Sequence, residues 1–81
     1  MKYTNAEFGR ELLAQLDRGY DPIRIARWAW QQFTDPDRRE RSDELRSALL
    51  DLVTMEEGTE FHIPETDLRS MARRFMASDG R

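Results

Sequence analysis

Apolar residues recur every three or four positions in four separate segments of the chain, and this spacing is the strongest constraint on the fold. It places the apolar side chains on one face of a helix, whereas a strand would need strict alternation. The pattern predicts an all-α fold, a small four-helix bundle with helices at about 5–18, 22–33, 43–57 and 65–77. We expect a single helical domain over residues 1–77 and a disordered tail at 78–81. The clearest apolar stripe comprises Leu68, Met71, Ala72, Phe75 and Met76.

Each predicted helix begins at residues that favour a helix start, and two of the helices end at a glycine. Thr4 and Glu7 fit a capping box, in which each side chain bonds a free backbone amide of the first turn. Tyr3 and Phe8 are placed for the hydrophobic staple that accompanies such a box. The remaining signals are an N-cap at Asp21 before Pro22, an N-cap at Ser42, Pro64 at the start of the last helix, and Gly19 and Gly58 as stops.

The composition limits the chemistry available to the chain. It has 81 residues with no cysteine and one histidine, which removes disulfides, thiolate catalysis and the usual nitrogen and sulfur ligands for zinc or iron. The formal net charge of −3, with 36% charged residues, suits a soluble surface and makes nucleic acid an unfavoured partner. The N-terminal residues lack the apolar run of a signal peptide, and no segment approaches membrane-spanning length. We therefore expect a cytoplasmic protein without a cofactor, a bound metal or a membrane partner.

The stretch IARWAWQQF, residues 25–33, carries two tryptophans that one helix cannot bury equally. At about 100° per residue, Trp30 flanks the apolar stripe, whereas Trp28 lies at its far margin beside polar side chains. We therefore expect Trp30 to be buried more readily than Trp28. Two interpretations of the Trp28 ring stay open: an interface anchor for a partner, or a ring that lies flat over a neighbouring helix or beneath Arg24.

Six acidic residues and no Lys or Arg occur between residues 51 and 67. Those at the start of the last helix suit the positive end of its dipole, but Glu56 and Glu57 fall at a helix end where the dipole disfavours each by up to about 1 kcal/mol. One interpretation is a solvated turn whose charge is offset by arginines of the last helix. The other is that Glu56, Glu57 and Glu60 form an acidic patch that attracts a basic partner protein.

The polar run TDPDRRERSDE, residues 34–44, predicts a solvated connection or a loosely held first turn. It is not an EF-hand calcium loop, because the positions that need a glycine and a final acid hold Glu40 and Arg46. Its arginines could contact phosphate, but the neighbouring carboxylates, Asp35 and Asp37 among them, would repel the same backbone.

His62 lies between Phe61 and Ile63 in a short extended link, and we expect these two apolar residues to pin the link against the core. Beside this histidine the sequence offers only scattered serines and no glycine-rich loop, which is short of a catalytic set. A structural or exposed histidine is therefore favoured over a general base. We expect the chain not to be an enzyme.

Two stretches, residues 25–33 and MEEGTEFHIPETDLRSMARRF at 55–75, together resemble uncharacterised short bacterial all-helical proteins. In such proteins an aromatic-containing second helix precedes a helix end with Met, Glu, Gly and Glu-Phe, and an amphipathic helix follows. The size and acidity are also similar to those of small helical immunity proteins that neutralise bacterial toxins. The resemblance implies a bacterial helical protein and brings no activity with it. It is carried by Trp30, Met55, Glu56, Gly58, Glu60 and Phe61.

Three functional hypotheses follow. The leading one is a non-catalytic interaction module that binds another, basic protein through Glu56, Glu57 and Glu60, with Trp28 as a further contact. The second is a self-associating structural protein in which Trp28 and the apolar margins pair two copies across a twofold axis. The third is a regulator that binds nucleic acid through the arginines of the last helix. Those arginines are Arg69, Arg73 and Arg74.

Overall fold

The computed structural model describes residues 2–78, and this part of the chain forms four α-helices. In the described residues there is no β-strand, only an isolated bridge between Lys2 and Glu40. The all-α prediction is therefore confirmed. The helices are α1 (Asn5–Asp17), α2 (Pro22–Thr34), α3 (Asp43–Thr54) and α4 (Glu65–Ser78), and the links contain the short 3₁₀ turns η1 (Pro36–Arg38), η2 (Met55–Glu57) and η3 (Thr59–Phe61).

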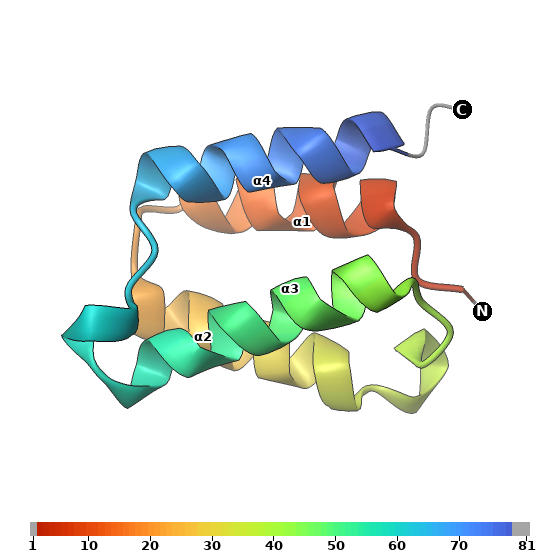
Figure 1. The fold of residues 1–81 in the computed structure, drawn as a ribbon, viewed down its shortest axis with the longest axis horizontal. Helices are drawn as coiled ribbons and strands as arrows, with labels where there is room; N and C mark the ends of the chain where they lie inside the picture. The colour runs from red at the N-terminus through yellow and green to blue at the C-terminus, as the bar shows by residue number, and fades with distance from the viewer. Residues whose placement is uncertain (1, 79–81) are drawn as a thin grey trace.

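The helices form two pairs, and the chain reverses its direction at each link (Figure 1). α1 packs beside α4 in one pair, and α2 packs beside α3 in the other. The links from α1 to α2 and from α3 to α4 cross between the pairs at the same end of the molecule. This is the up-and-down bundle that short links between amphipathic helices favour.

Phe8 of α1 is wholly buried and joins the two pairs. Its ring lies edge-on to Phe75 of α4 at 4.9 Å and stacks on Trp28 of α2 at 6.0 Å, measured between ring centroids. Tyr3 also meets it edge-on at 6.4 Å, which confirms the predicted staple at the start of α1. Aromatic pairs in these geometries stabilise a fold beyond the apolar area that they bury.

The capping residues act as the sequence predicts. The Thr4 hydroxyl accepts a hydrogen bond from the Glu7 amide at 3.1 Å, and the Glu7 carboxylate accepts one from the Thr4 amide at 3.0 Å, which lowers the pKa of Glu7. The side chains of Asp21 and Ser42 cap α2 and α3 by accepting a hydrogen bond from the backbone amide three residues later. Gly19 follows α1 with a φ of 115°, a left-handed conformation that favours glycine.

The C-terminal ends of the helices differ from the predicted ones, by one residue at α1, α2 and α4 and by three residues at α3. α3 ends at Thr54, because the following residues tighten into η2 before the chain becomes extended at Gly58. α4 continues through Ser78, whose hydroxyl accepts a hydrogen bond of 3.0 Å from the Asn5 side chain, so the predicted disordered tail is wrong for this residue. The rest of that predicted tail, residues 79–81, lies outside the described residues.

The polar link between α2 and α3 is held more firmly than the sequence indicates. Nη1 of Arg38 lies 2.7 Å from Oε1 of Glu11, and its guanidinium lies over the Tyr3 ring at 4.2 Å. Arg41 donates a hydrogen bond of 3.0 Å to the Phe33 carbonyl oxygen near the end of α2. The alternative of a loosely held turn is therefore wrong here, since these two arginines tie the link to α1 and α2, whereas the expected solvation is confirmed because most side chains of residues 34–44 are exposed.

Replacing Tyr3 by phenylalanine is expected to lower the free energy of unfolding by about 1 kcal/mol. The Tyr3 ring is buried and its hydroxyl donates a hydrogen bond of 2.7 Å to Glu11. Burial, together with this bond to a carboxylate, raises the pKa of Tyr3 well above its usual value. Phenylalanine keeps the ring contact with Phe8 and removes only the hydroxyl. Urea unfolding of the two proteins measures the loss, and identical midpoints would contradict it.

Candidate protein-binding groove between α2 and α3

The two tryptophans have exchanged their expected environments. Trp28 packs against the core, with its ring stacked on Phe8 of α1 at an interplanar angle of 16°. Trp30 is 51% exposed and stacks on Phe33 at 5.9 Å. The prediction that Trp30 is the more buried ring is therefore wrong, and the interpretation that Trp28 lies flat over a neighbouring helix is confirmed. Trp30 offers a partner more indole surface than Trp28 does.

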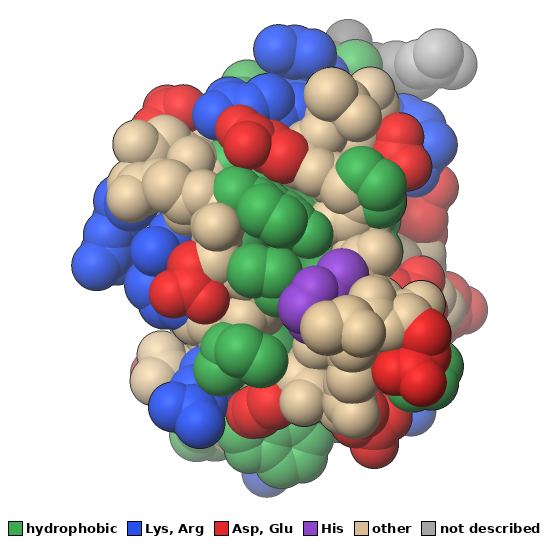
Figure 2. Space-filling model, turned by 90° about the vertical axis from the view of Figure 1, so that its left-hand side faces the viewer, with side chains coloured by type: hydrophobic (Ala, Val, Ile, Leu, Met, Phe, Trp, Pro, Cys, Tyr) green, Lys and Arg blue, Asp and Glu red, His purple; other side chains and the backbone are tan. Residues whose placement is uncertain are grey.

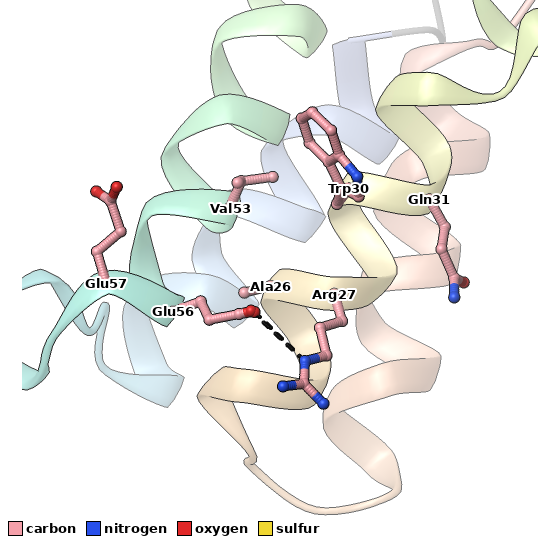
Figure 3. Close-up of a pocket in the computed structure, with 7 residues that line it drawn as sticks. All are labelled: Ala26, Arg27, Trp30, Gln31, Val53, Glu56 and Glu57. Atoms are coloured by element: carbon pink, nitrogen blue, oxygen red, sulfur yellow. Dashed lines mark hydrogen bonds and ion pairs between the residues drawn. The ribbon is translucent and has the colours of Figure 1, made fainter.

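An open groove of about 570 Å³ lies between α2 and the end of α3 (Figure 3). Trp30 of α2 and Val53 of α3 stand on its two sides, and Ala26 lies between them. Ala26 is buried and, like Val53, it is too small to fill the space between the two helices. The groove therefore results from small side chains at a helix contact with a large aromatic ring at its edge. Its remaining lining residues are Arg27, Gln31, Glu56 and Glu57.

An ion pair closes one end of this groove. Nε of Arg27 lies 3.3 Å from Oε1 of Glu56 and joins α2 to η2 (Figure 3). The Arg27 side chain is 71% exposed and the Glu56 side chain 39% exposed, so water screens the pair. Such a pair contributes at most about 1 kcal/mol. The expectation that arginines of α4 offset the charge of Glu56 is wrong, because the cation comes from α2.

The other predicted acidic residues lie in different places. Buried Met55 directly precedes Glu56 and Glu57, and both glutamates are exposed. Glu57 lies on the α3 side of the groove, away from Arg27, and no Lys or Arg among residues 2–78 forms an ion pair with it. Glu60 is exposed in η3 and does not line the groove. Glu56 and Glu57 thus line the same groove as Trp30, with their carboxylates turned to different sides.

A second exposed apolar surface lies at the end of the bundle where the chain crosses between the helix pairs. Figure 2 looks onto this end and shows a band of hydrophobic side chains beside the histidine. The elements that meet there contribute Tyr20, Ile23 and Phe61, each more than a third exposed. Phe61 at 47% exposure does not pin the link to the core, so that prediction is wrong. It is confirmed for Ile63, which packs against the core and accepts a hydrogen bond of 2.6 Å from the Tyr20 hydroxyl.

The arginines of α4 do not form a uniformly free cationic face. Arg69 lies 2.9 Å from Glu65 and 3.2 Å from Asp17, so two carboxylates neutralise its charge. Arg73 and Arg74 are exposed. The two carboxylates beside Arg69 weaken the attraction of α4 for a phosphate backbone.

Within residues 2–78, no three His, Cys, Asp or Glu side chains are gathered as metal ligands, and none of the helices there has the length and apolar character to span a bilayer. His62 follows η3 in an extended conformation and is partly exposed. No protein-family model, curated protein or solved structure matches the chain.

Proposed function

We propose that this chain is a non-catalytic interaction module that binds another protein through the groove between α2 and α3. The exposure of Trp30 is the observation that carries the proposal, because this large aromatic residue is 51% exposed beside an apolar groove. Tryptophan is enriched among the residues that dominate binding energy at protein interfaces. The stacking of Trp30 on Phe33 holds the ring in place, so little further side-chain entropy is lost when a partner covers it.

The shape of the groove supports a helical partner. It is open along its length and is bounded by two helices, a form that accepts the apolar face of a third helix. Trp30 and Val53 provide the apolar contact over buried Ala26, and Glu56 with Glu57 provides the charged edge of the site. A small acidic module of this kind, in a bacterial cytoplasm, would act by occupying its partner, as immunity proteins do.

Replacing Trp30 by alanine is expected to weaken partner retention by roughly tenfold or more. The same change should cost only about 1 kcal/mol in unfolding free energy, since the ring is half exposed and loses one stacking contact. Affinity capture from the source cells, with quantitative comparison of each retained protein between wild type and variant, measures the first effect. Thermal unfolding measures the second.

Phe61→Ala is the matched control, because Phe61 is an aromatic residue of similar exposure outside the groove. It should retain the same proteins as the wild type. If Phe61→Ala releases them and Trp30→Ala keeps them, the binding surface is the end of the bundle and the proposal is refuted.

A further inference from the structure

We infer that the partner is a basic amphipathic helix, and that Arg27 holds Glu56 in the free protein as a placeholder for a Lys or Arg of that helix. The inference rests on the proposed function, and it names the partner chemistry and the residue that the partner displaces. It follows from the negative charge at the end of the groove, from the apolar side chains beside it, and from the exposure of the ion pair between Arg27 and Glu56.

The charges at the end of the groove favour a cation. Glu56 and Glu57 lie on η2, which continues α3 at the end where the helix carries partial negative charge. Arg27 is the cation that pairs with Glu56, and Glu57 has no ion-pair partner in the described part of the chain. A Lys or Arg that enters here therefore meets the Glu56 carboxylate at the negative helix end, while Glu57 adds negative charge on the α3 side of the groove.

The apolar part of the groove lies one helical turn away from this charged end. Trp30 and Arg27 are three residues apart on α2, a separation of about 5–6 Å between side chains on one helix face. A partner helix repeats this spacing when an aliphatic residue and a Lys or Arg stand three or four positions apart. The aliphatic side chain would then lie against Trp30 and Val53 while the cation reaches Glu56.

Arg27 is suited to be displaced. Its side chain is 71% exposed and a single ion pair to Glu56, at 3.3 Å, crosses the groove. Exchange of one cation for another at Glu56 costs little, because an exposed pair is weak and the released guanidinium returns to water. Arg27 therefore competes with the partner for Glu56 and also repels its positive charge.

The test uses a synthetic amphipathic helical peptide of Leu and Lys, with a second peptide in which Glu replaces every Lys. Calorimetric titration gives the affinity, and backbone amide shifts identify the surface. Removing Arg27 by Arg27→Gln should tighten binding of the Lys peptide by about two- to fivefold. Arg74→Gln removes the same charge from α4 and should leave the affinity unchanged. Glu56→Gln combined with Glu57→Gln should weaken it by about tenfold.

Four results would overturn the inference. Equal tightening by Arg27→Gln and Arg74→Gln would show an effect of net charge alone. Equal binding of the Glu peptide would remove the preference for a basic partner. A dimer in sedimentation that Trp30→Ala dissociates would make a second copy the occupant. If neither peptide shifts the groove amides while Trp30→Ala still releases captured proteins, the partner chemistry is wrong and the proposed function stands.

Discussion

Replacing Phe8 by alanine is expected to lower the free energy of unfolding by about 3–5 kcal/mol. Phe8 is wholly buried, and its ring contacts three aromatic rings. These are Tyr3 before α1, Trp28 of α2 and Phe75 of α4. Alanine would leave a cavity where the two helix pairs meet and would remove the surface on which Trp28 stacks. At about 0.05–0.15 kcal/mol per residue, a chain of 81 residues has a total stability of about 4–12 kcal/mol. The variant should therefore lose a large part of its stability and unfold at a much lower urea concentration.

Far-UV circular dichroism during urea unfolding measures this loss. Phe61→Ala is again the control, because it removes a phenylalanine that is half exposed and should change the stability by no more than about 0.5 kcal/mol. Phe8→Leu keeps most of the buried volume and should cost less than the alanine variant. A Phe8→Ala protein as stable as Phe61→Ala would show that the two helix pairs do not depend on this ring.

The helix starts, and the approximate end of α1, were predictable because their causes are local. The capping box of Thr4 and Glu7 and the left-handed Gly19 each involve atoms within a few residues of one another. The link between α2 and α3 was not predictable in this way. Arg38 and its partner Glu11 are 27 residues apart, so the composition of the link shows a polar run and hides the contacts that fix it.

The candidate site was predictable in part. Glu56 and Glu57 could be predicted as candidate binding residues because carboxylates at the end of a helix oppose its dipole, and this argument needs only the local sequence. Which tryptophan is buried could not be predicted from local sequence, since a helical wheel places Trp28 and Trp30 on opposite margins of one apolar stripe. Phe8 of α1 covers one margin, whereas the small Val53 lies across the groove from the other. The sequence signal that could have indicated a gap between α2 and α3 was Ala26, a small residue inside the apolar stripe of α2.

Replacing Gly9 by alanine is expected to lower the free energy of unfolding by about 1–3 kcal/mol. The direction is the opposite of the usual one, because glycine to alanine inside an exposed helix stabilises it by about 1 kcal/mol. A Cβ atom on Gly9 would lie 2.5 Å from the carbonyl oxygen of Ala72 and 2.6 Å from Cγ of Met76. The Met76 side chain can turn aside, but the Ala72 oxygen belongs to the backbone of α4. The two helices would therefore have to move apart.

Ala14→Gly is the matched control, because Ala14 is exposed on the same helix and should lose about 1 kcal/mol through helix propensity alone. The two opposite substitutions on α1 should thus both destabilise the protein in thermal unfolding. A more stable Gly9→Ala protein would show that α1 and α4 separate without cost. Because α2 and α3 build the groove, folded Gly9→Ala protein should still bind the Lys peptide with wild-type affinity. The close contact of α1 with α4 would then serve stability, and the looser contact of α2 with α3 would serve binding.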